Sequence, residues 1–134
     1  MIYILDACAM IAYLRKETGG GLVKDALSDP TNECVAHAIN FCEVYYDIYR
    51  SSGQQDAEGA IQGLEAMGLT IRDDFSAEFW QAAGRLKAIH RRVSLADCFA
   101  ITLAQRLGGT ILTSDHHGFD TIAAQGVCRV TFIR

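Results

Sequence analysis

The chain has 134 residues, a length that fits one compact domain and excludes most two-domain architectures. Half of the residues are hydrophobic, 21% are charged and only one is proline, so the composition excludes a disordered chain and a low-complexity repeat. The net charge of −4 excludes a protein that holds nucleic acid through overall positive charge alone.

Hydrophobic periodicity and turn residues predict strands that alternate with helices. In chain order, the predicted elements are strand Ile2–Leu5, helix Ala7–Arg15, helix Leu22–Leu27 after the glycines 19–21, strand Cys34–Ala38, helix Phe41–Tyr49, helix Ala57–Met67, strand Leu69–Arg72, helix Ala77–His90, helix Leu95–Leu107, strand Thr110–Thr113, helix Phe119–Ala124 and strand Cys128–Ile133. The best strands are apolar on both faces, which is typical of a parallel sheet covered by helices on both sides. We therefore predict a three-layer α/β fold that forms a single domain over residues 1–134, because no repeat or linker divides the chain.

Two further features concern the compartment. No apolar run is long enough for a membrane span, and Asp6 interrupts the apolar start that a signal peptide would need. We therefore expect a cytoplasmic protein that does not associate with a membrane. The cysteines are five in number and include no C-x-x-C pair. We expect them to be reduced and mostly buried.

Two acids follow predicted strands. Asp6 ends the first strand, and Asp115 lies just past the strand in TILTSD. Ligands of parallel α/β sheets bind beyond the carboxyl ends of the strands, so these acids are candidates for a functional site. Each also fits an ordinary helix cap or turn residue.

Two more acids belong to helices. Asp97 lies on the apolar side of SLADCFAITLAQRL and shares a helix face with Ile101 and Ala104. A capping box with Ser94 is the structural alternative for Asp97, and a capping box with Asn40, or a solvated helix face, is the alternative for Glu43. Together with the two strand-end acids, Asp97 and Glu43 would converge at one rim of the sheet, each in the first turn of a helix.

Carboxylates that cluster need cations, because like charges raise one another's pKa. Hard oxygen ligands favour Mg²⁺ or Mn²⁺, whose remaining ligands are commonly waters and phosphate oxygens. A phosphodiester is the natural substrate for such a site, with water activated by the cation.

These residues resemble the PIN-domain nucleases, and especially the VapC-like toxins of bacterial toxin–antitoxin pairs. The segments that carry the resemblance are IYILDACAMIAYL, NFCEVYYDIYR, RVSLADCFAITLAQRLGGTILTSD and HHGFD. The resemblance implies a central five-stranded parallel sheet with the first and fourth strands adjacent. It also implies a metal-dependent endoribonuclease, a homodimer and a cognate antitoxin. The acids of the family's metal site correspond to Asp6, Glu43, Asp97 and Asp115. Thr113 corresponds to the hydroxyl residue two positions before the last acid and is a candidate for contact with the substrate.

The sequence departs from the family pattern at two positions. Ala7 follows Asp6 where members usually have Ser or Thr, and His117 lies where some members have another acid, which puts a second metal site in doubt. Imidazole is able to bind Mn²⁺, but adjacent histidines seldom address one ion. We therefore expect His116 and His117 to form an exposed loop pair near the substrate.

Basic residues precede Asp97 and are candidates for contact with a phosphate chain: Lys87, His90, Arg91 and Arg92. An ordinary solvated helix end is the alternative. Single-stranded RNA is the favoured substrate, because unpaired bases are able to stack on side chains. Two other functions remain open. One is a PIN-fold module that binds RNA or a partner without turnover. The other is phosphoryl transfer through an aspartyl phosphate at Asp6, although such enzymes need an acid two residues later, where this chain has Cys8.

Overall fold

The computed structural model describes residues 1–134 and contains five strands and seven helices. Their bounds are β1 Ile2–Leu5, α1 Ala7–Leu14, α2 Gly20–Ser28, β2 Glu33–His37, α3 Ala38–Ser52, α4 Gln54–Ala66, β3 Thr70–Arg72, α5 Ala77–Ile89, α6 Leu95–Leu107, β4 Thr110–Thr113, α7 His116–Ala124 and β5 Arg129–Phe132. All strands are parallel, in the order β3-β2-β1-β4-β5. The predicted three-layer α/β class and the adjacent first and fourth strands are confirmed.

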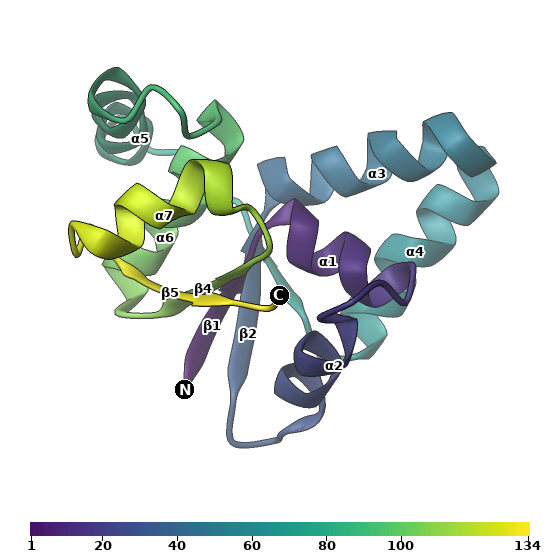
Figure 1. Cartoon of the computed structure of the whole chain (residues 1–134). Coiled ribbons are helices and arrows are strands. Elements are labelled where there is room, and N and C mark those ends of the chain that lie inside the picture. The colour runs from purple at the N-terminus through teal and green to yellow at the C-terminus, as the bar shows by residue number, and fades with distance from the viewer.

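Helices cover both faces of the sheet and form two separate hydrophobic cores (Figure 1). Successive strand residues point to opposite faces. Leu5 and Leu112 therefore pack under α1–α4, while Ile4 and Ile111 pack under α5–α7. All four of these side chains are fully buried, which explains why adjacent residues in the middle of the sheet are apolar on both faces.

The strand order reverses between β1 and β4, where the chain returns to the centre of the sheet. The register pairs Leu5 with Leu112, so both strands end at the same level. In parallel α/β sheets this switch point opens a crevice at the carboxyl ends of the strands. Residues that directly follow β1 and β4 therefore meet at this place.

Four helices begin earlier than the sequence predicted, because their caps are not evident from periodicity. His37 caps α3: its Nδ1 accepts a hydrogen bond from the Ile39 amide at 3.1 Å, so the helix begins at Ala38. The alternative of a capping box of Asn40 with Glu43 is therefore wrong, and Glu43 lies in the second turn of α3 rather than the first. The other three helices are α7, which Asp115 caps so that it begins at His116, α2, which begins at Gly20, and α4, which begins at Gln54 after Gly53.

The cysteine prediction is confirmed only in part. All five thiols are free, but Cys34 and Cys98 alone are buried, while Cys8 and Cys42 are exposed and Cys128 is intermediate. None of the helices combines the length and the apolar character that crossing a membrane requires.

Candidate active site

Asp6 and Asp115 meet at the switch point and are linked by one hydroxyl group. Asp6 is fully buried and caps α1, where its Oδ1 accepts from the Ala9 amide at 2.9 Å. The buried Thr113 hydroxyl donates to Asp6 Oδ2 and accepts from the Asp115 amide at 3.0 Å. Asp115 Oδ1 accepts in turn from the Gly118 amide at 3.1 Å. The cap alternatives considered for both acids therefore hold, and the caps fix each carboxylate at the end of its strand.

Asp97 lies in the first turn of α6 and is 8% exposed. The Ser94 hydroxyl caps this helix by accepting from the Asp97 amide at 3.1 Å. The cap uses the backbone of Asp97, so its carboxylate stays available for another partner. A nearly buried carboxylate without a cationic partner is costly, which distinguishes this acid from an ordinary capping residue.

Glu43 approaches the site from α3 and is held by Asn40, one turn earlier. Asn40 is fully buried, and its Nδ2 lies 3.5 Å from Glu43 Oε1 and 3.4 Å from the Ala96 carbonyl oxygen. This amide therefore connects α3 to the first turn of α6, next to Asp97. Its own Oδ1 is buried without a hydrogen-bond partner. Sequence reasoning assigned Asn40 only to a cap, and no spacing signal distinguishes the two roles.

Three of these acids, Asp6, Asp97 and Glu43, have raised pKa values. Burial, and then the charge of Asp97, raise the pKa of Asp6 to about 8. Burial, and then the charge of Glu43, raise the pKa of Asp97 to about 7, and Asp115 adds to both shifts. Burial also raises the pKa of Glu43, against the Asn40 amide, which lowers it. The structure thus brings the four predicted acids into one negatively charged region, where full ionisation is unfavourable.

None of these four acids has a cationic partner in the protein. Each ion pair of the molecule uses another acid: Asp47, Asp74, Glu78, Asp120 or Glu17. No three Asp, Glu, His or Cys side chains form a ready-made set of metal ligands. The chemistry of the donor set nevertheless fits a hard divalent cation, because it consists of two buried and two half-buried carboxylates without a positively charged partner. Asp6, Asp97 and Asp115 are the residues able to hold it, with Glu43 at the α3 side.

The two histidines differ from the expectation. They lie in the first turn of α7 rather than in a loop. Both ring nitrogens of His116 are engaged, Nδ1 with Asp120 at 2.7 Å and Nε2 with the Arg134 carbonyl oxygen at 2.8 Å. His116 therefore holds the C-terminal residues. His117 is also exposed, and its side chain makes no hydrogen bond or ion pair.

The predicted basic residues divide into two groups. Lys87 Nζ donates to the carbonyl oxygens of Arg91 and Val93, at 2.9 and 2.8 Å, and so shapes the turn between α5 and α6. Arg91 and Arg92 are exposed on this turn and make no ion pair. Of these basic groups, the two arginines are the ones free to contact a phosphate.

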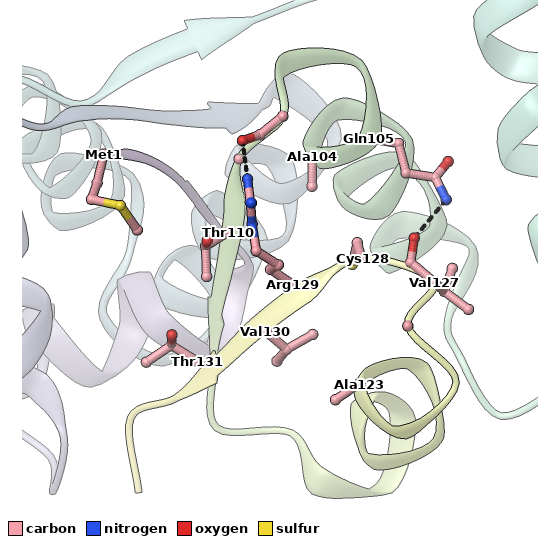
Figure 2. Close-up of a pocket in the computed structure, with 13 residues that line it drawn as sticks. Met1, Ala104, Gln105, Thr110, Ala123, Val127, Cys128, Arg129, Val130 and Thr131 are labelled. Atoms are coloured by element: carbon pink, nitrogen blue, oxygen red, sulfur yellow. Dashed lines mark hydrogen bonds between the residues drawn. The ribbon is translucent and has the colours of Figure 1, made fainter.

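The largest cavity, about 700 Å³, lies at the other end of the sheet, where β4 and β5 begin (Figure 2). Arg129 donates there to the Gly108 carbonyl oxygen, and Gln105 donates to that of Val127. None of the four acids lines this cavity. Cavity size therefore does not identify the acidic site.

Together, the fold and the site define a class: a three-layer α/β protein with an acidic centre at the switch point of a five-stranded parallel sheet. The PIN domain family model matches residues 3–125, and the chain belongs to this family. VapC-type members are nucleases, which supports an activity on nucleic acid. Among curated proteins, none matches the chain.

Solved structures of toxin–antitoxin proteins share the fold. The structure of VapBC2 from Rickettsia felis, bound to a DNA fragment from its promoter, gives a TM-score of 0.76 at 18% identity and covers 98% of each chain. VapBC-1 from nontypeable Haemophilus influenzae gives 0.71 at 20% identity, over 99% of this chain and 98% of that one. VapC20 from Mycobacterium tuberculosis, a toxin that cleaves the sarcin–ricin loop, gives a TM-score of 0.69 at 15% identity. The match covers 94% of this chain and 95% of that one.

Proposed function

We propose that the protein is a divalent-metal-dependent endoribonuclease and the toxin of a toxin–antitoxin pair. One observation carries this proposal: four acids from four segments lie near one another at the carboxyl edge of the sheet, and none has a cationic partner in the chain. A structural ion-pair network would have supplied arginine or lysine at this place. The acids instead suit a site for Mg²⁺ or Mn²⁺ and a phosphodiester.

The residues of the chain have distinct roles in this proposal. Asp6, Asp97 and Asp115 hold the cation, and Glu43 does so directly or through water. When bound, a divalent cation supplies activation of the attacking water and stabilisation of the developing negative charge. The water oxygen forms the new bond to phosphorus as the bond to the leaving ribose oxygen breaks. Thr113 keeps Asp6 and Asp115 in fixed orientation, and no side chain acts as a covalent nucleophile.

The test uses purified protein and a mixture of RNAs, with Mg²⁺, with Mn²⁺ and with chelator. We expect Asp97→Asn to lower metal-dependent cleavage by more than about 100-fold, because even residues behind metal ligands contribute 10–100-fold. Asp25→Asn is the matched control, since Asp25 is an exposed acid on α2 without an ion pair. Cleavage that persists with Asp97→Asn, or in chelator, would contradict the proposal.

The partners follow from the same proposal. Several structural relatives are complexes of toxin with antitoxin, so we infer a cognate antitoxin that places basic side chains at the acidic centre, and a homodimer. A PIN-fold binding module without turnover is the second candidate, favoured by Ala7 and His117; it predicts RNA or partner binding and no metal-dependent product. Phosphoryl transfer is disfavoured, because Cys8 lies where an acid would be needed.

A further inference from the structure

A second cavity, of about 340 Å³, lies between the α5–α6 turn and one face of α7; we call it the α7 pocket. Gly118, Thr121, Ile122 and Gln125 line it from α7, and their spacing of three and four residues places them on one helix face. Buried Val93 and the exposed Arg91 and Arg92 line it from the turn. His90 and the exposed Ile89 line it from the end of α5. The α7 pocket thus has an apolar floor of Val93 and Ile122, polar side chains in its walls and two arginines at its edge.

The α7 pocket adjoins the acidic centre on two sides. Gly118 belongs to its wall, and the Gly118 amide donates to Asp115 Oδ1 at 3.1 Å. Val93 belongs to the opposite wall, and the next residue, Ser94, caps the turn that carries Asp97. A polymer whose phosphate lies at the acids therefore reaches the α7 pocket with a neighbouring nucleotide.

The rim arginines are exceptional in this molecule. Six of the nine arginines are held by carboxylates or a carbonyl oxygen: Arg15, Arg50, Arg72, Arg106, Arg134 and Arg129. The other three, Arg85, Arg91 and Arg92, have no acidic partner, and two of them line the α7 pocket. Unpaired guanidinium groups bind phosphate and stack on bases.

The walls between the arginines suit a base rather than a second phosphate. Ile122 and Val93 are buried and apolar, while the Thr121 hydroxyl and the Gln125 amide offer both donors and acceptors. The volume falls near the lower end of the range for small-ligand sites, about 300–1,000 Å³. We propose that the α7 pocket binds one base of single-stranded RNA, next to the scissile phosphate, while Arg91 and Arg92 hold the adjoining phosphates. This inference rests on the proposed function, and in it the α7 pocket selects the sequence that is cleaved.

Binding is measured by fluorescence anisotropy with the Asp97→Asn protein in chelator, so that no RNA is cut. The probes are labelled single-stranded ribo-octanucleotides of A, C, G or U, and an abasic octamer with the same phosphates. We expect one homopolymer to bind about tenfold more tightly than the abasic octamer, the size typical of one stacked base. Equal affinity for all five probes would overturn the inference.

Two kinds of variant separate the base from the phosphates. Thr121→Phe fills the α7 pocket from an exposed position, and Gln125→Ala removes its amide; we expect both to reduce the preference among bases, with unchanged melting temperature. Arg91→Ala and Arg92→Ala should weaken the binding of every probe. Each should also reduce the slope of log affinity against log salt concentration by about one. Arg85→Ala is the matched control, because Arg85 is exposed and unpaired but does not line the α7 pocket. A base preference that survives Thr121→Phe would contradict the assignment.

Cleavage by the wild-type protein separates this inference from the proposed function. If the wild type cuts RNA with Mn²⁺ at the same positions as Thr121→Phe, the α7 pocket does not select sequence and only the inference fails. If the wild type cuts no RNA, the proposed function fails. A base preference in chelator would then still support the α7 pocket as the RNA site of a binding module.

Discussion

Thr113 shows how much one buried hydroxyl group contributes to the site. The hydroxyl donates a hydrogen bond to Asp6 and accepts one from the Asp115 amide, so it connects the ends of β1 and β4. Sequence reasoning placed Thr113 among residues that contact substrate. In the structure it is fully buried and faces the acids, which suits a positioning residue.

We expect Thr113→Val to weaken Mn²⁺ binding by about 10–100-fold and to lower RNA cleavage in parallel, because Asp6 loses a donor. It should also cost about 1–3 kcal/mol of the free energy of unfolding, since the Asp115 amide loses its acceptor. Calorimetry with Mn²⁺ and urea unfolding measure the two effects. Thr102→Val is the matched control, because the buried Thr102 hydroxyl donates only to Cys98 of its own helix. Equal Mn²⁺ affinity in the two variants would contradict this role.

At the scale of elements, the join between α1 and α2 depends on one close approach of backbones. Gly19 adopts a positive φ of 93°, and α2 then begins at Gly20 against the end of α1. A Cβ atom at Gly20 would lie 2.4 Å from the Ala12 carbonyl oxygen, whereas one at Gly21 would meet nothing within 4 Å. Adjacent glycines in the sequence therefore have opposite structural requirements.

Gly20→Ala should lower the free energy of unfolding by about 1–3 kcal/mol, because the contact is with backbone and α1 must shift. Gly21→Ala, the neighbouring control, should be neutral or stabilising by up to about 1 kcal/mol, since alanine favours the helix. Urea unfolding of both variants provides the comparison. Similar stabilities would show that α1 and α2 do not pack as described.

At the scale of the whole molecule, the buried acids make folding sensitive to pH. The pKa values of Asp6 and Asp97 rise from 3.8 to about 8 and about 7 on folding. Between the unfolded and folded values, the folded protein binds more protons than the unfolded chain. The free energy of unfolding therefore falls as pH rises through this interval, and the fall ends above the folded values.

We expect the melting temperature in chelator to decrease from pH 5 to pH 8. Asp97→Asn should flatten this decrease and raise the melting temperature at pH 8, because one buried charge is gone; Asp25→Asn should leave it unchanged. Mn²⁺ at 100 times its Kd should stabilise the wild type at pH 8 by about 2.7 kcal/mol and the Asp97→Asn protein by less. Scanning calorimetry over this pH range checks all three expectations, and a melting temperature that rises with pH would refute the electrostatic description.

The sequence predicted elements best where hydrophobic periodicity and capping residues indicate the same bounds. The helix Leu95–Leu107 and the strand Thr110–Thr113 were predicted with the observed bounds, because Ser94 and Gly108 mark the helix ends by their cap chemistry. The start of α3 was missed by three residues. Its cap is the His37 imidazole, whose ring packs against Phe79 and Phe99, and such tertiary support leaves no local signal.

Composition and local pattern were thus sufficient for the fold class and for the four candidate acids, because burial and strand ends leave traces in neighbouring residues. The mutual arrangement was decided only by tertiary structure. The order β2-β1-β4 places Asp6 beside Asp115, and the Asn40 amide connects Glu43 to the α6 turn of Asp97 across 56 residues of sequence. Contacts between distant segments depend on packing of the whole sheet, so no local pattern specifies them. The α7 pocket is of the same kind, since its two walls come from segments that only the folded chain brings together.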